Sequence, residues 1–191
     1  GTPLPTHTIW MSATVDERVL RTVDHPEVGT CIQLTDDDLE NPALTKRLEA
    51  VKQLERFDAS GVAPSELPRA LADEVVERHR SKTRTLVVLN RVDTARAVYR
   101  AIQKRGPDAD VVLLHSRFRP PDRKAHTETM LADPGRYGTI VVATQVIEAG
   151  VDMTSALLVT ETSPWSSFVQ RAGRCNRGGE YEDGASVLWV D

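Results

Sequence analysis

The chain has 191 residues, of which 40% are hydrophobic and 5% aromatic, with 24 Lys and Arg against 28 Asp and Glu. This composition is typical of one globular domain and excludes collagen, coiled coil and wholesale disorder. No apolar run approaches the roughly 18–20 residues of a membrane helix, and no secretory signal pattern is present, so we expect a cytoplasmic protein without membrane contact. The net charge of −4 excludes a uniformly basic surface, so any grip on nucleic acid must be local.

The first 83 residues have an irregular pattern. We expect strands at Thr8–Met11 and Thr30–Leu34. Asn41-Pro42 is typical of a helix start, and the apolar stripe that predicts this helix to about Phe57 consists of Leu44, Leu48, Val51 and Leu54. A second helix is predicted from about Ser65 to His79.

From residue 84 onward, short apolar runs alternate with helical segments. The predicted strands are Thr85–Leu89, Val111–Leu114, Thr139–Ala143, Ala156–Thr160 and Ser186–Val190. Continuous apolar runs are typical of strands that are buried on both faces of a parallel sheet. Predicted helices lie at 92–104 and between Pro120 and Asp133. The pattern predicts an α/β fold: a doubly wound, mainly parallel sheet with helices on both faces and its ligand edge at the strand carboxyl ends.

The most informative stretch is the basic segment at residues 169–179. Gln170, Arg174 and Arg177 are four and three residues apart, so a helix would place them on one face, with Arg171 at its flank. Three arginines within seven residues repel one another unless an anion lies opposite, and the guanidinium fork suits phosphate. The alternative is a solvated basic helix end, which is equally consistent with this segment alone.

The sequence Gln-Arg-x-Gly-Arg-x-x-Arg at 170–177 resembles motif VI of superfamily 2 helicases. Other motifs of these helicases occur in the same order along the chain. Ser12-Ala13-Thr14 resembles motif III, 86–90 with Arg91 resembles motif IV, and 142–152 resembles motif V. His115-Ser116-Arg117 lies where a nucleic-acid loop should follow a strand. The resemblance implies a RecA-like fold, with 26–191 as the second RecA-like domain and 1–25 as a strand and linker from the preceding one.

Within this superfamily the sequence is most similar to Cas3, the helicase-nuclease family of type I CRISPR systems. The resemblance rests on 115–118, 143–148 and Pro164-Trp165-Ser166-Ser167 leading into the motif VI segment. The sequences Trp-Ser-Ser and Arg-Cys-Asn-Arg within this region are most similar to subtype I-G, formerly I-U. The chain has no Gly-x-x-x-x-Gly-Lys-Ser/Thr loop and no His-Asp nuclease motif, and its two cysteines do not form a zinc framework, so no metal site is expected. We therefore expect this chain alone to hydrolyse no ATP.

The resemblance implies an ATP site shared with the first RecA-like domain, which would hold most of the Mg²⁺-bound nucleotide. Arg174 and Arg177 would be arginine fingers, and Gln170 would lie near the γ-phosphate or the attacking water. Gly150 and Asp152 would meet the ribose, with Arg171 also close to the nucleotide. A turn role is the alternative for Asp152. Ser12, Ala13 and Thr14 would couple the nucleotide state to the DNA state.

Single-stranded DNA would lie along the ends of the strands. Thr144 is expected to open a helix whose free amides suit a phosphate, with Gln145 beside it. The other candidate DNA contacts are Asn90, Arg91, His115, Ser116 and Arg117. An imidazole satisfied within the fold is an equal alternative for His115, and Trp165 is expected in the core.

The implied partners are the first RecA-like domain and the HD nuclease domain of the same protein, and the CRISPR surveillance complex (Cascade). Two alternatives remain open. One is the second RecA-like domain of another superfamily 2 helicase that acts on DNA or RNA, since phosphate contacts do not distinguish the two sugars. The other is a non-catalytic anion-binding α/β module in which 171–177 docks a partner.

Overall fold

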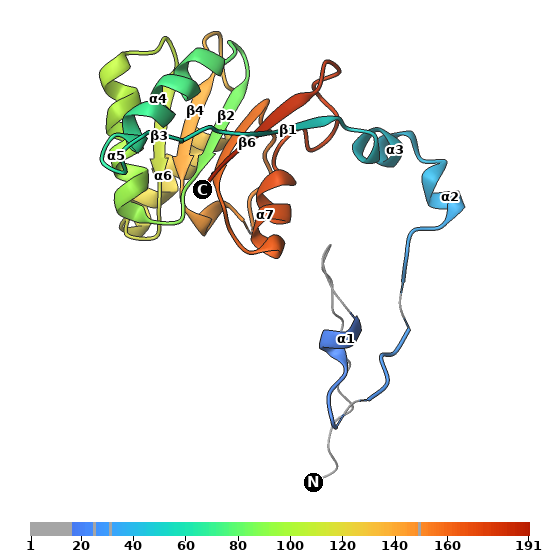
Figure 1. The fold of residues 1–191 in the computed structure, drawn as a ribbon. Helices are drawn as coiled ribbons and strands as arrows, with labels where there is room; N and C mark the ends of the chain where they lie inside the picture. The colour runs from blue at the N-terminus through green and yellow to red at the C-terminus, as the bar shows by residue number, and fades with distance from the viewer. Residues whose placement is uncertain (1–16, 25, 31, 149) are drawn as a thin grey trace.

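The computed structural model describes residues 17–24, 26–30, 32–148 and 150–191, and its centre is a six-stranded sheet (Figure 1). All strand pairs are parallel, and the strand order is β1-β6-β5-β2-β4-β3. The strands are β1 (Lys52–Arg56), β2 (Arg84–Val88), β3 (Asp110–Leu114), β4 (Thr139–Ala143), β5 (Leu157–Glu161) and β6 (Ala185–Val190). The five strands predicted after residue 84 are confirmed to within one residue at each end.

Helices cover both faces of this sheet. On one face, α4 (Leu67–Arg78) and α5 (Val92–Arg105) pack their buried side chains against Val87, Val142 and Val159. On the other face, α6 (Pro120–Leu131), the 3₁₀ turn η1 (Gln145–Ile147) and α7 (Trp165–Ala172) pack against Leu86, Val141 and Leu158. Alternate residues of one strand therefore point into different cores, which is why these strands read as continuous apolar runs. The doubly wound α/β fold is confirmed.

Local sequence signals set several helix ends. Arg105 is followed by Gly106, which lies in the left-handed region at φ 60° and closes α5. Pro120 occupies the first turn of α6, where its missing N–H costs nothing. Asn41 caps α3 (Pro42–Leu48) by accepting from the Ala43 N–H at 3.0 Å, so that predicted helix start is confirmed.

The predicted end of this helix near Phe57 is wrong. The helix α3 stops at Leu48, and residues 52–56 form β1, which pairs with β6 at the edge of the sheet. The stripe residues Leu48, Val51 and Leu54 are more than half exposed, so helical spacing did not reflect a buried face. The open edge of β6 supplies a ladder of backbone hydrogen bonds, and this tertiary pairing decides the conformation.

The segment before α3 carries two short helices, α1 (Glu17–Leu20) and α2 (Asp36–Leu39), and extends away from the sheet (Figure 1). The strand predicted at Thr30–Leu34 is wrong for the described residues of that range, where the backbone pairs with no strand and Ile32 is 93% exposed. The predicted strand Thr8–Met11 and the coupling residues Ser12, Ala13 and Thr14 lie outside the described residues. The proposed boundary at residue 25 is therefore an untested expectation.

Candidate functional site

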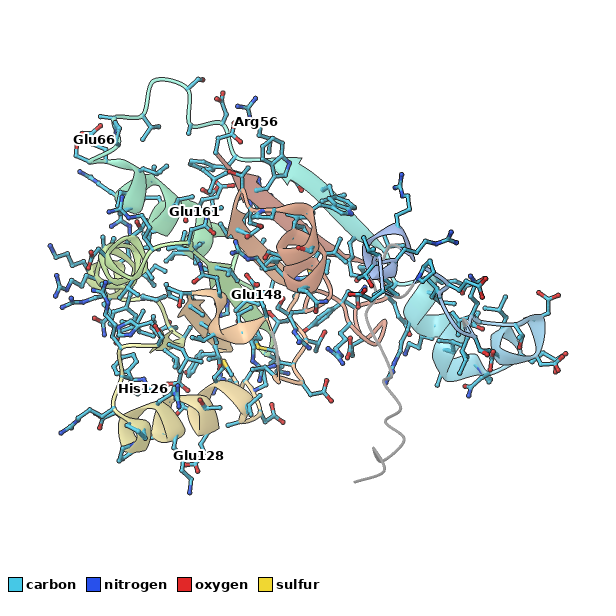
Figure 2. All side chains as sticks on the ribbon, turned by 90° about the horizontal axis from the view of Figure 1, so that it is seen from below. Arg56, Glu66, His126, Glu128, Glu148 and Glu161 are labelled. Carbon is cyan, nitrogen blue, oxygen red and sulfur yellow. The ribbon has the colours of Figure 1, made fainter. Side chains whose placement is uncertain are left out.

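Four strands place polar side chains at one edge of the sheet. The strands β2, β3, β4 and β5 run in parallel, and their carboxyl ends lead into Asn90, His115, Thr144 and Glu161. Figure 2 shows Glu148 and Glu161 near the middle of the domain, whereas His126 and Glu128 lie on α6. The carboxyl edge of a doubly wound sheet is where such folds bind ligands.

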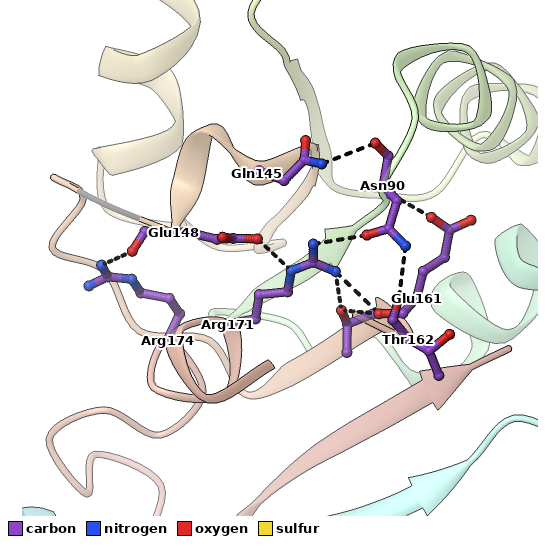
Figure 3. Close-up of polar contacts among 8 residues, drawn as sticks. Asn90, Gln145, Glu148, Glu161, Thr162, Arg171 and Arg174 are labelled. Carbon is purple, nitrogen blue, oxygen red and sulfur yellow. Dashed lines mark hydrogen bonds and ion pairs between the residues drawn. The ribbon is translucent and has the colours of Figure 1, made fainter. Parts of the chain in front are cut away.

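The guanidinium of Arg171 lies just behind this edge and is 1% exposed (Figure 3). Its Nε donates to Glu148 Oε1 at 2.8 Å, and its Nη2 donates to Asn90 Oδ1 at 2.9 Å. Its Nη1 donates to Thr160 Oγ1 at 3.0 Å and to the Glu161 carbonyl at 3.2 Å. We call these five residues the Arg171 network. All three nitrogens of Arg171 are used within the protein, so this geometry does not support direct contact with ATP.

Asn90 is fixed by four hydrogen-bond partners, two of which, Thr162 and Gln145, lie outside the Arg171 network. Its Nδ2 donates to the Thr162 carbonyl at 2.8 Å, which leaves Oδ1 facing Arg171. Its backbone N–H donates to the Glu161 carboxylate, and its carbonyl accepts from Gln145 Nε2 at 3.2 Å. The strand tips of β2 and β5 and the turn η1 are therefore tied together through one residue.

The remaining arginines of the basic segment are not on a helix. The helix α7 ends at Ala172 with Gly173 as its C-cap, so the prediction that Gln170, Arg174 and Arg177 share one helical face is wrong. Gln170 lies half-buried on α7, and the chain beyond it turns into a short parallel bridge between Ser155 and Cys175. In this bridge the Ser155 N–H donates to the Arg174 carbonyl at 2.9 Å. This isolated bridge, and not helical spacing, brings together the two loops that resemble motifs V and VI.

Arg174 is buried, and among the described residues no carboxylate forms an ion pair with it. It is 7% exposed, its Nη2 donates to the Glu148 carbonyl at 3.0 Å, and its Nε has no hydrogen-bond partner. Burial lowers the pKa of this guanidinium, the nearby positive charge of Arg177 lowers it further, and Asp152 acts in the opposite direction. The cation is therefore short of negative charge and retains a free donor.

Arg177 and Asp152 form an ion pair at 3.1 Å next to this uncompensated charge. Both side chains reach solvent, since they are 41% and 89% exposed. Gly150 precedes them at φ 72°, a conformation that favours glycine, and a Cβ there would meet no atom within 4 Å. Open space at Gly150 and the exposed carboxylate of Asp152 thus lie beside Arg174 and Arg177, an arrangement that suits a phosphorylated ligand with hydroxyl groups.

Asn176 fixes the loop that carries Arg177. It is 1% exposed with φ 45°, and its Nδ2 donates to the carbonyls of Val51 and Tyr181, both at 3.1 Å. Its Oδ1 accepts from the Tyr181 N–H at 3.0 Å. The adjacent Cys175 is no nucleophile, because burial raises the pKa of its thiol to about 11.

The candidate DNA residues differ in accessibility. Four of them are exposed: Arg91, Ser116, Arg117 and Gln145. The ion pair between Arg117 and Asp93 is long, at 3.7 Å, and both side chains are exposed. Thr144 is 2% exposed and precedes η1, which is a single 3₁₀ turn in place of the expected helix. The accessible members of this group are therefore basic or neutral polar side chains on three neighbouring strand ends.

His115 is buried at the end of β3, and its Nδ1 has no hydrogen-bond partner. The ring stacks on Phe118 at 4.1 Å between centroids, and Phe118 stacks in turn on His126 at 4.6 Å. Burial lowers the pKa of His115, and the charges of Arg96, Arg117 and His126 lower it further. The fully satisfied imidazole considered for this position is not what the structure has.

Trp165 is 73% exposed, so its expected place in the core is wrong. It is the first residue of α7, and its ring stacks on Phe168 at 5.9 Å. The helix turns Phe168 and Ala172 toward the sheet, which leaves the first residue pointing outward.

Glu148, Thr160 and Asn176 carry structural roles in the site that the sequence analysis did not assign. Glu148 lies inside the segment that resembles motif V, and a carboxylate there was the available signal, because a buried arginine needs a counter-charge. Asn176 lies inside the motif VI segment, where Asn is one of the few residues that tolerate a positive φ.

Within the described ranges, no group of three or more metal-ligating side chains occurs. Over those same residues, no helix has both the length and the apolar character needed to cross a membrane.

The fold is that of a RecA-like helicase C-terminal domain. The C-terminal domain of the DEAD-box protein Dbp5 superposes with a TM-score of 0.56 at 16% identity, over 75% of this chain and 78% of that chain. The family model described as "CRISPR-associated nuclease/helicase Cas3, C-terminal" matches residues 81–180, and the chain belongs to this family.

Curated relatives agree with this assignment. A putative CRISPR-associated nuclease/helicase Cas3 of Methanocaldococcus jannaschii is 33% identical over 58% of this chain and 15% of its own length. A CRISPR-associated nuclease/helicase Cas3 of Methanothermobacter thermautotrophicus is 37% identical over 54% of this chain and 12% of its own length. The chain thus spans less than a fifth of these relatives.

Solved structures show the same fold. The T. fusca Cas3–AMPPNP structure superposes with a TM-score of 0.64 at 22% identity, over 74% of this chain and 18% of that one. A chain of the structure titled "CRISPR RNA-guided surveillance complex, pre-nicking" is 26% identical, with a TM-score of 0.61 over 74% of this chain and 19% of that chain. These matches leave the CRISPR subtype unresolved.

Proposed function

We propose that this chain is the second RecA-like domain of an ATP-driven Cas3-type translocase that moves along single-stranded DNA in CRISPR interference. The observation that supports it most directly is the buried Arg174 with a free Nε and no carboxylate, next to the Arg177–Asp152 pair. An isolated buried cation is costly, so a site that keeps one is suited to an anion supplied from outside.

The anion in this proposal is the γ-phosphate of ATP, cradled mainly by the first RecA-like domain with its Mg²⁺. Arg174 and Arg177 would stabilise the charge on the transferred phosphoryl group, and Gln170 would orient the attacking water. Gly150 and Asp152 would hold the ribose, with the Asp152 carboxylate accepting from a hydroxyl. The solved structures of T. fusca Cas3 with AMPPNP and with ATP support the choice of nucleotide.

The single strand would lie along the carboxyl edge of the sheet. Arg91, Ser116, Arg117 and Gln145 would contact phosphates, with Asn90, His115 and Thr144 shaping the edge beneath them. Domain closure on ATP would bring a second set of phosphate contacts from the preceding domain, and hydrolysis would release it. The partners would be the HD nuclease domain and a CRISPR surveillance complex, as the names and titles of relatives indicate.

The test is Arg174→Ala in the full-length protein that contains this chain. We expect ATP hydrolysis stimulated by single-stranded DNA to fall by about 10³–10⁵, whereas DNA binding measured by fluorescence anisotropy is retained. Arg119→Ala is the matched control, because Arg119 is exposed and its ion pair among the described residues is with Asp122 in the first turn of α6.

Two outcomes would contradict the proposal. Loss of binding with no change in hydrolysis would favour a module that docks a partner through 171–177. Stimulation by single-stranded RNA but not by DNA would favour another superfamily 2 helicase.

A further inference from the structure

We propose that Arg171 is a positioning residue that couples the DNA edge of the sheet to the nucleotide face. This inference deepens the proposed function and rests on it. The Arg171 side chain is 1% exposed and all three of its nitrogens donate within the protein, so we assign it no direct contact with DNA or ATP. It links the residue at the tip of β2 to the residue that holds Arg174.

The DNA side of this link is Asn90. The Arg171 Nη2–Asn90 Oδ1 bond at 2.9 Å joins two residues 81 positions apart in the sequence. Because the backbone carbonyl of Asn90 also accepts from Gln145, a shift of the exposed Gln145 side chain on binding a phosphate acts on Asn90 directly. Asn90 thus connects the exposed Gln145 side chain to the buried guanidinium of Arg171.

The nucleotide side of the link is Glu148. Its carboxylate accepts from Arg171 Nε at 2.8 Å, and its backbone carbonyl accepts from Arg174 Nη2 at 3.0 Å. The two arginines therefore hold opposite ends of one residue (Figure 3). A displacement of the Glu148 side chain moves the carbonyl that places Arg174 beside Arg177 and Asp152.

The anchor of the network lies on β5 and limits how the Arg171 guanidinium can move. Arg171 Nη1 donates both to Thr160 Oγ1 and to the Glu161 carbonyl, which belong to the rigid central strand β5. The guanidinium is planar and is held at β5, so it pivots about this strand and cannot follow either partner freely. Lysine would keep the charge opposite Glu148 but could not hold Asn90 and Thr160 at the same time.

The experiment measures the coupling itself. In the full-length protein, the dissociation constant of a fluorescein-labelled single strand is measured with and without AMPPNP, and the ratio of the two constants is the coupling between the sites. We expect the wild-type ratio to lie within the usual range of about 5–150. Arg171→Lys should bring this ratio to within about twofold of one, while the constant without nucleotide changes by less than about threefold.

Arg105→Lys is the matched control. Arg105 is also a multiply bonded arginine, since it contacts Asp73, the Ala101 carbonyl and the Arg69 carbonyl, but it joins α4 to α5 away from the site. This variant should keep the wild-type ratio. Should Arg171→Lys fail to fold, Glu148→Gln serves in its place, because it removes the charge and leaves the carbonyl that Arg174 uses.

The outcomes separate this inference from the proposed function. A wild-type protein that binds neither AMPPNP nor single-stranded DNA would overturn the proposed function and, with it, the coupling. The other outcome concerns Arg171 alone. If the wild type binds both AMPPNP and single-stranded DNA, and the folded Arg171→Lys or Glu148→Gln variant has the same coupling ratio as the wild type, the role of Arg171 is overturned and the proposed function stands.

Discussion

Arg171 and Arg174 lie three residues apart and are both buried, but their surroundings are opposite. Arg171 has a carboxylate and three further acceptors, whereas Arg174 has one backbone carbonyl and a free Nε. The first environment satisfies a permanent charge and makes it part of the fold. The second leaves a charge that, in the proposed function, the γ-phosphate would satisfy. The same residue type thus serves structure and candidate chemistry in one motif.

The largest effect we expect on stability is from Arg171→Met. This change leaves the Glu148 carboxylate, which is 17% exposed, facing an apolar side chain, and it leaves Asn90 Oδ1 and Thr160 Oγ1 without their donor. Breaking a buried pair in this way typically costs about 3–5 kcal/mol. Urea unfolding followed by circular dichroism measures the loss. The double variant Arg171→Met/Glu148→Leu should recover part of it, and no recovery would argue that the pair is not the cause.

Asn176→Ala should have the next largest effect. The change removes three hydrogen bonds that fix the loop of Arg177, each worth about 1 kcal/mol, and it places Ala at a positive φ. Asn176→Gly relieves the backbone and isolates the hydrogen bonds, so its loss of stability should be the smaller of the two. Equal losses in the two variants would show that the backbone conformation contributes nothing.

Arg174→Met should change the free energy of unfolding by less than about 1 kcal/mol, because the lost hydrogen bond to the Glu148 carbonyl is offset by the removal of a desolvated charge that Arg177 repels. The same urea experiment compares it with Arg171→Met. A loss as large as that of Arg171→Met would mean that Arg174 is a structural residue and would weaken its role as a finger.

The sequence was sufficient to predict one half of this molecule and not the other. Strands β2 and β4 are buried over their whole length, so their apolar runs carry their own signal. Strand β1 is mostly polar at the sheet edge, and pairing with the distant β6 makes it a strand, so the prediction of one helix from Pro42 to about Phe57 was wrong beyond Leu48.

The candidate site also has a part that the sequence predicted and a part that depends on distant contacts. The motif resemblance identified Gln170, Arg174 and Arg177 as a group, and the β-bridge at Cys175 does bring the loops of Asp152 and Arg177 together. The difference between Arg171 and Arg174 was not predictable, because it depends on partners 23 and 81 residues away. Burial of Arg171 and exposure of Trp165 are both decided by how α7 lies on the sheet.

Two histidines, the half-buried His79 and the buried His115, extend the comparison to a base that can lose its proton. Burial lowers the pKa of both His79 and His115, so both are neutral in the fold at pH 7. A lowered pKa means that the unfolded chain binds more protons, so stability is complete above the unfolded pKa of about 6.5 and falls as the pH drops toward the folded pKa, by at most about 1.4 kcal/mol per pH unit for each histidine.

Urea unfolding between pH 7.5 and 5.0 measures this slope. His115→Leu should reduce the slope and leave the contribution of His79. An unchanged slope in the variant would show that the orphaned Nδ1 of His115 is protonated without cost.

The smallest effect should come from the exposed pair of Arg119 and Asp122, which join at 2.7 Å in the first turn of α6. The distance is similar to that of the Arg171–Glu148 pair, but Arg119 is 83% exposed and water competes for both charges. The Arg119 guanidinium lowers the pKa of Asp122, so any stabilisation is present at neutral pH and is lost in acid, below the ordinary carboxyl range. Arg119→Gln should therefore leave the urea midpoint at pH 7 unchanged within error. A loss comparable to that of Arg171→Met would show that hydrogen-bond length, and not burial, sets the strength of these arginine pairs.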